Sequence, residues 1–159
     1  MNVLLAVILA AVDLAGGGLA KITSASTYYD RKEGYAHFRG QVFVDDEKYK
    51  LHADRAFVFM DGTNELKRIV AIGNVAMTND TKRAYGAKAS YYREAGVVVL
   101  HAGENGAAEV RDETPKGNNV VRGKKIKFWI DSEQVEVMEA EISAPSSGGF
   151  GNLKGVLGK

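Results

Sequence analysis

Three histidines are the side chains of this sequence best suited to acid-base or metal chemistry near neutral pH. They are His37, His52 and His101, and they lie in separate apolar segments with no His-Glu-x-x-His spacing among them. The chain has no cysteine, which excludes disulfides, Cys-ligated zinc and cysteine nucleophiles together. It also lacks a Gly-x-Ser-x-Gly elbow and a Gly-x-x-x-x-Gly-Lys-Ser/Thr phosphate loop. We therefore expect no enzyme, no metal site and no cofactor.

Two weaker patterns have a chemical interpretation. The pair Asp45-Asp46 could hold calcium in a turn, but it lacks the alternating oxygen-ligand spacing of a defined calcium loop. The aromatic residues Trp129, Tyr28-Tyr29 and Tyr91-Tyr92 could form a platform for stacking sugars, although aromatic residues at strand ends more often pack against a core. A carbohydrate-binding or hydrolytic β-sandwich therefore stays open as an alternative.

The charges are balanced along the chain. There are 21 Lys and Arg against 20 Asp and Glu, giving a net charge of +1, and the two signs are interspersed. Clusters such as Lys124-Lys125-Lys127 and Asp45-Asp46-Glu47 are typical of solvated strand or turn positions. The order of charges predicts no electrostatic footprint for nucleic acid or for an anionic membrane.

A short pattern that recurs four times indicates the architecture. Each copy has an apolar residue, a small residue two places on, a small or apolar residue three further, and a bulky residue two beyond that. The copies start 29, 33 and 37 residues apart, and they are Ile22-Ser24-Thr27-Tyr29, Leu51-Ala53-Ala56-Val58, Ala84-Gly86-Ala89-Tyr91 and Val121-Gly123-Ile126-Phe128. A repeat of this period predicts one supersecondary unit stacked on copies of itself.

The spacing within each copy predicts a bent strand. Steps of two match the period of a strand, whereas the central step of three would turn later side chains to the opposite face unless an extra residue is bulged out. We therefore expect β-bulges near Ala25-Ser26, Asp54-Arg55, Ala87-Lys88 and Lys124-Lys125. The small residues Ser24, Ala53, Gly86 and Gly123 either leave room at the bend or allow close packing there.

A second element follows each copy and contains alternating apolar residues. The first two examples end in Gly40-Gln41-Val42 and Gly73-Asn74-Val75, whereas Gly103 of the third is followed by Glu104-Asn105-Gly106, so looser pairing is expected there. No helical stripe occurs after residue 21, and the short apolar runs predict an all-β, antiparallel chain of roughly ten to twelve strands. Parity places apolar residues on one face and turns the following to the other: Tyr35, His37, Arg39, Arg68 and Asn74. A plain β-sandwich is the alternative architecture.

The chain divides into three parts. Residues 1–20 form an apolar run that ends in Gly18-Leu19-Ala20, which resembles a secretory signal cleaved after Ala20. No Lys or Arg precedes the run, and Asp13 interrupts it, which disfavours a retained membrane span. Residues 21–144 are expected to form the β domain, and residues 145–159 a Gly/Ser-rich flexible tail.

Three segments carry a resemblance to a known family. They are Ile-Thr-Ser-Ala-x-x-Tyr-Tyr-Asp-Arg-Lys-x-Gly (Ile22 to Gly34), Gly-Gln-Val-x-Val (Gly40 to Val44) and Leu-His-Ala-Asp-Arg-Ala (Leu51 to Ala56). They resemble the OstA-like family of organic-solvent-tolerance and lipopolysaccharide-transport proteins, over about Ile22 to Ile142. The resemblance implies an open, twisted antiparallel β-jellyroll of stacked V-shaped turns in the periplasm. Its apolar interior would carry the acyl chains of lipopolysaccharide from the inner to the outer membrane.

Parity and the resemblance together assign a lipid-binding interior. Its expected residues are Phe38, Val42, Val44, Val58, Ile69, Val75, Met77, Tyr91, Ile126, Phe128, Val135 and Val137.

The expected partners are the lipid A acyl chains of lipopolysaccharide and other transport proteins of the same fold at both membranes, with no nucleic acid. A head-to-tail homo-oligomer would pair the two end strands, through Ile22 and Tyr29 at one end and Val137 and Ile142 at the other. Two alternatives stay open: a structural β-repeat that only self-assembles through its edges, and the inner-membrane-anchored partner of the same transport system.

Overall fold

The computed structural model describes residues 21–45, 50–62, 65–79, 82–114, 117–129, 132 and 134–143. Within these ranges the chain forms twelve strands of one antiparallel sheet and no helix. The strands are β1 (Lys21–Thr23), β2 (Ser26–Asp30), β3 (Tyr35–Asp45), β4 (Lys50–Met60), β5 (Leu66–Asn79), β6 (Lys82–Tyr92), β7 (Val97–His101), β8 (Ala108–Thr114), β9 (Gly117–Gly123), β10 (Lys125–Trp129), β11 (Val135–Met138) and β12 (Glu141–Ser143). The predicted all-β, open antiparallel architecture is confirmed.

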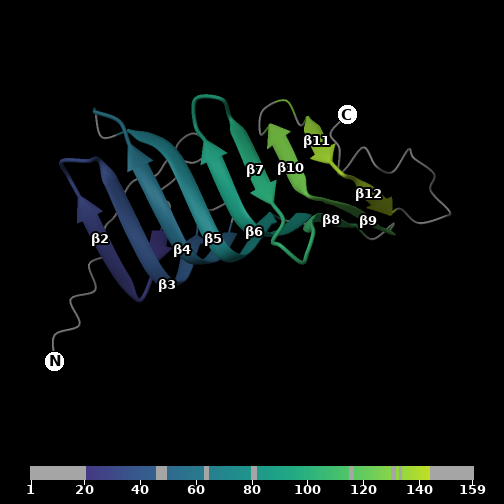
Figure 1. The fold of residues 1–159 in the computed structure, drawn as a ribbon, viewed down its shortest axis with the longest axis horizontal. Coiled ribbons are helices and arrows are strands. Elements are labelled where there is room, and N and C mark those ends of the chain that lie inside the picture. Colours follow the sequence, from purple (N-terminus) through teal and green to yellow (C-terminus); the bar gives the residue numbers. More distant parts are fainter. Residues whose placement is uncertain are drawn as a thin grey trace.

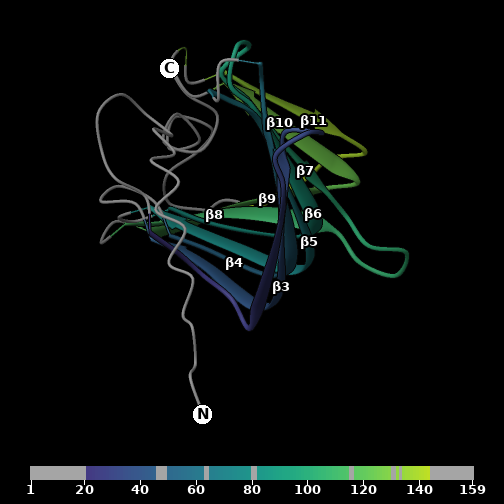
Figure 2. The same ribbon diagram turned by 90° about the vertical axis from the view of Figure 1, so that its left-hand side faces the viewer.

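The sheet is bent across its middle into a V (Figures 1 and 2). The four long strands β3, β4, β5 and β6 run through the bend, which we call the corner, and contribute to both sides of the V. The upper arm is completed by β2, β7, β10 and β11, and the lower arm by β1, β8, β9 and β12. The two arms therefore face each other across an inner surface.

The corner follows from irregular pairing at one level of the sheet. The register of β3 against β4 shifts between Arg39 and Val42, and that of β5 against both neighbours shifts just before Val75. At these points Gly40-Gln41 and Gly73-Asn74 have positive φ angles between 47° and 83°. A left-handed backbone there adds a residue to one strand and bends it.

The sequence correctly predicted that the sheet bends beside Asp54-Arg55. It did not predict which of the paired strands holds the extra residue. No residue is added at Asp54-Arg55, because the longer segment lies in the partner strands β3 and β5, where glycine allows the left-handed turn. At Ala87-Lys88 the strand β6 changes partner from β8 to β7. At Ala25-Ser26 and Lys124-Lys125 there is no bulge, because one strand ends there and the next strand begins in the other arm.

Glycine at the corner serves close packing. A Cβ atom on Gly86 would lie 2.7 Å from Cδ1 of Leu100, and one on Gly123 would lie 2.6 Å from Cγ1 of Val137. Both distances are shorter than real Cβ contacts. Of the two roles considered for these small residues, the geometry supports close approach and not open room.

The third repeat unit departs from the others, as its missing valine suggested. The strand β7 ends at His101, the chain turns through 102–107, and β8 starts the lower arm at Ala108. The first two units instead cross the corner within one continuous strand, β3 or β5. The strand β8 still pairs in regular register with β6 and β9.

Several predictions fall outside the described residues. They concern the leader 1–20, its cleavage after Ala20, the tail 145–159, and Asp46 and Glu47 of the acidic cluster. Over the ranges that are described, no helix has the length and apolarity needed to cross a membrane.

Candidate functional site

The inner surface of the V is the candidate site. All twelve residues assigned to the interior lie in or against one of two apolar clusters on this surface. The cluster nearer the N-terminus contains Phe38, Val42, Val44, Val58 and Ile69, with Tyr91 packed against it. The second contains Val75 and Ile126, with Met77, Phe128, Val135 and Val137 packed against it.

In the second cluster burial decreases from the corner outward along both arms, whereas Val44, Val58 and Ile69 of the first cluster stay buried, at 2–7% exposed. On β10, Ile126 next to the corner is 0% exposed, whereas Phe128 on the next inward position is half-buried. On β5 the same step leads from Val75, 2% exposed, to the half-buried Met77. The corner is thus filled by protein side chains, and accessible apolar surface lies further out along both arms.

The alternation of side chains along the strands did not identify every residue of this surface. Leu100 is fully buried in the second cluster and pairs with Ala89 and Ile126, and Val98 lies opposite Tyr91 and Phe128. Because Val97-Val98-Val99-Leu100 is uniformly apolar, alternation could not tell which of its side chains face inward. The pairing register was the missing information.

The two ends of the sheet carry the predicted edge strands. At one end β1 and β2 each pair only with β3, and at the other β11 pairs only with β10 and β12 only with β9, among the residues described. Ile22 on β1 is buried in the first cluster, and Tyr29 on β2 is 40% exposed. Val137 is paired with Ile126, and the backbone of Ile142 with that of Val121. Among the described residues, each arm therefore ends in an unpaired strand edge at both ends of the sheet: β1 and β12 in the lower arm, and β2 and β11 in the upper arm.

Comparison with protein families gives a match over residues 21–134, to the family described as LptA/(LptD N-terminal domain) LPS transport protein. The chain belongs to this family. The resemblance expected from the OstA-like segments is thereby confirmed. The chain matches none of the curated proteins with which it was compared.

A solved structure shares the fold of this family member. It is LptH from Pseudomonas aeruginosa, the LptA-homologous periplasmic component of the lipopolysaccharide transport device of that organism. The match has a TM-score of 0.66 at 21% sequence identity, and covers 79% of this chain and 93% of LptH. At this identity the likeness establishes the fold.

The three histidines of this LPS-transport family member do not form a site. His37 stacks on Phe57 with ring centroids 4.0 Å apart, and the ring of His52 lies 4.5 Å from that of Phe43. His101 is paired between Lys88 and Lys125, on two neighbouring strands. Among the described residues, no group of His, Asp and Glu could hold a metal ion.

Two histidines are biased towards their neutral form. Burial lowers the pKa of His101, and the charges of Lys88 and Lys125 lower it further. Burial likewise lowers the pKa of His37, with Arg39 and Arg55 adding to the effect. Both lie on the outer side of the upper arm, away from the apolar interior.

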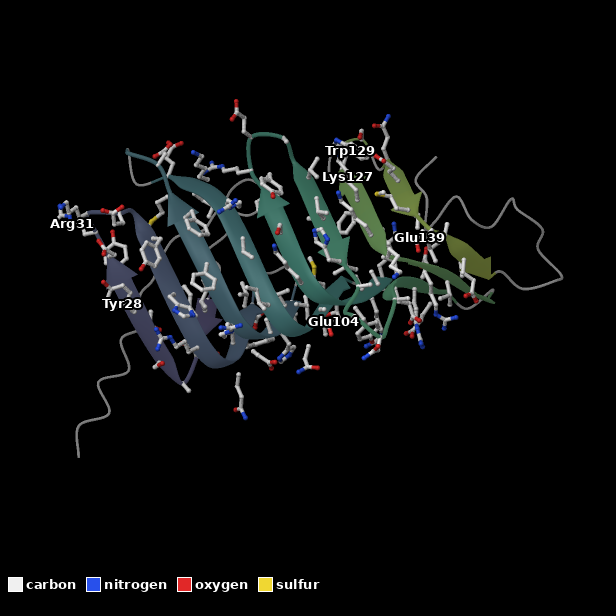
Figure 3. The ribbon with its side chains drawn as sticks, in the orientation of Figure 1. Tyr28, Arg31, Glu104, Lys127, Trp129 and Glu139 are labelled. Atoms are coloured by element: carbon white, nitrogen blue, oxygen red, sulfur yellow. The ribbon has the colours of Figure 1, made fainter. Side chains whose placement is uncertain are left out.

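The aromatic residues considered for sugar stacking are divided between the two faces of the sheet. Tyr29 and Tyr91 share the inner face with their paired partners, whereas Tyr28 and Tyr92 point outward. Trp129 also lies on the outer side, where the Nζ atom of Lys127 sits 4.5 Å from its ring centroid (Figure 3). Neighbouring tyrosines in the sequence therefore do not contribute to one common platform.

Proposed function

We propose that this chain is a non-enzymatic lipopolysaccharide-transport protein that carries acyl chains along the inner surface of the V, between the inner and outer membranes. Membership of the LptA/(LptD N-terminal domain) family supports the transport role. The observation that carries the acyl-chain assignment is the half-buried apolar surface on the facing arms, formed by residues such as Met77, Tyr91 and Phe128.

The energetics favour hydrocarbon at this position. Each methylene group moved from water to an apolar surrounding contributes about 0.8 kcal/mol, so even partial burial of several acyl chains offsets the loss of their freedom. Because the sheet is open and its arms meet only at the corner, a bound chain could lie along the V across many strands. A closed core would offer no such path.

Mass spectrometry of lipids that co-purify with the native protein tests this function. We expect lipopolysaccharide to be retained by the wild type and by Thr78→Glu, whose side chain lies on the outer face of β5. We expect Met77→Glu, one position away on the inner face, to reduce the amount bound because it places a carboxylate on the apolar surface. A wild type that carries no lipid would favour the self-assembling scaffold instead.

We further propose that the protein is exported and works in the periplasm after cleavage behind Ala20. The apolar run ending at Ala20, interrupted by Asp13, supports export over a retained span. N-terminal sequencing of protein from its native host should give Lys21 as the first residue. An intact Met1 in the membrane fraction would instead assign the chain to the anchored branch of the transport system.

Head-to-tail association through the edge strands is the third part of the proposal. The two ends of the sheet are different surfaces, so the contact would be heterologous and could extend into open filaments. Val137→Pro on β11 should shorten concentration-dependent oligomers seen by light scattering, because proline removes a ladder donor and fixes its φ angle. Circular dichroism should show that the variant keeps its strands. A wild type that stays monomeric at high concentration would contradict edge pairing.

A further inference from the structure

A row of basic side chains crosses the outer side of the upper arm next to the corner. Arg39 on β3 lies directly opposite Arg55 on β4, and Lys88 on β6 is followed across the sheet by His101 on β7 and Lys125 on β10. Only Ile72 on β5 interrupts the series. We call these five basic residues the basic row.

The basic row has no acidic partners within the described part of the chain. The ion pairs found there involve Arg83, Arg111 and Arg122, all on the lower arm. Arg39 donates from Nε to Nδ1 of His37, and the nearby carboxylate of Asp54 accepts a hydrogen bond from Asn74. Like charges directly opposite each other destabilise a sheet. An external anion bound to the basic row would reduce this repulsion.

The outer side of the upper arm beyond the basic row carries mainly aromatic and apolar side chains. The next positions carry His37, Phe57, Val70, Ser90, Val99 and Lys127, with Glu136 opposite Lys127, and those after them carry Tyr35, Phe59, Arg68, Tyr92, Val97 and Trp129. The guanidinium of Arg68 lies 4.5 Å from the ring centroid of Phe59. Figure 3 shows Trp129 and Lys127 together at the upper end of β10, with Tyr28 near the opposite end of the sheet.

The extent of this face indicates the size of its partner. Neighbouring strands lie about 4.8 Å apart, so the five steps from β3 to β10 span about 24 Å. A single phosphate could contact only part of such a row, whereas a surface of many anionic groups would contact all of it. Tyr92 and Trp129 in the adjoining rows combine an apolar body with a polar tip, as residues at the membrane-water boundary do.

We propose that the outer side of the upper arm docks on a membrane surface containing anionic phospholipids. The basic row would contact the headgroups, and Tyr92 and Trp129 would enter the boundary between headgroups and acyl chains. This proposal departs from the expectation of no footprint for an anionic membrane, which was drawn from the order of charges along the chain. Strand pairing gathers cations that lie far apart in the sequence.

The only tryptophan of the chain, Trp129, reports on this contact directly. With vesicles of phosphatidylcholine mixed with phosphatidylglycerol, we expect its emission to shift to shorter wavelength and to be quenched by brominated acyl chains. Vesicles of phosphatidylcholine alone should cause neither change. Added salt should weaken the effect because it screens the basic row.

Charge reversal provides the decisive variants. Lys88→Glu combined with Lys125→Glu should weaken co-sedimentation with the anionic vesicles by about tenfold or more, since each basic residue near such a surface contributes about 1 kcal/mol. The matched control, Lys50→Glu combined with Lys82→Glu, changes charge equally at exposed positions of the lower arm and should bind like the wild type. Circular dichroism checks that both variants are folded. Absence of wild-type binding, or equal loss in both variants, would overturn the proposal.

Discussion

The outer faces of the two arms differ in ion pairing: within the described part of the chain, the ion pairs lie on the lower arm. On the lower arm, the carboxylate of Glu109 accepts hydrogen bonds from both Arg111 and Arg122. Nε of Arg83 lies 2.8 Å from Oε2 of Glu113, and Nη1 of Arg122 lies 3.7 Å from Oε1 of Glu141 on the edge strand β12. Cations from three strands are thereby neutralised within the sheet.

On the upper arm, the basic side chains next to the corner face one another with no carboxylate directly opposite them. Arg39 lies opposite Arg55, and the pKa of His101 is depressed by its burial and by the two lysines beside it. Long strands such as β4 and β6 contribute to both arms, so the difference does not arise from separate domains. A chain of nearly zero net charge can therefore have one face on which the charges neutralise one another and another face suited to an external anion.

Removal of Glu109 should have the largest effect on this contrast. Burial alone would raise the pKa of this carboxyl, but hydrogen bonds from Arg111 and Arg122 outweigh it and hold the pKa below its usual range. Glu109→Gln should lower the free energy of unfolding by about 1 kcal/mol in urea titrations, because two arginines lose their shared anion. Glu136→Gln on the upper arm should change it little. Equal losses would show that the arms do not differ.

An arginine removed from the upper arm should act with the opposite sign. Arg55→Gln relieves the repulsion from Arg39, so we expect a gain of about 0.5 kcal/mol in the free energy of unfolding. Arg122→Gln on the lower arm should instead destabilise, because Glu109 and Glu141 lose a partner. The comparison fails if both substitutions shift the urea midpoint in the same direction.

The smallest expected effect is on the pH dependence of stability. Because the pKa of His101 is lowered on folding, the unfolded chain binds more protons between the folded pKa and the ordinary value of about 6.5. Its contribution to stability is therefore present above about pH 6.5 and is lost as the pH falls through the folded pKa. His101→Gln should flatten thermal stability over this window. An unchanged slope would indicate that the basic row does not act on His101.

The sequence was sufficient to predict the fold and the inner face. Alternation with a period of two places Phe38, Val42 and Val75 on one side of a strand, whatever strand lies beside them. The basic row required more, because Arg39 is placed opposite Arg55, and Lys88 is placed in line with Lys125, only through strand pairing. The bulged strand was also mispredicted, since an odd step shows that two partners differ in length without showing which of them is longer.

Site-specific photo-crosslinking to labelled lipopolysaccharide tests the central claim most directly. A crosslinker placed at Met77 or at Phe128, both half-buried on the inner surface, should capture the label. One placed at Ala76 or at Lys127, the preceding positions whose side chains face outward, should not. Capture confined to the two inner positions is the result the lipid-carrying V predicts. Equal capture at all four positions, or capture only at the outer two, would contradict it.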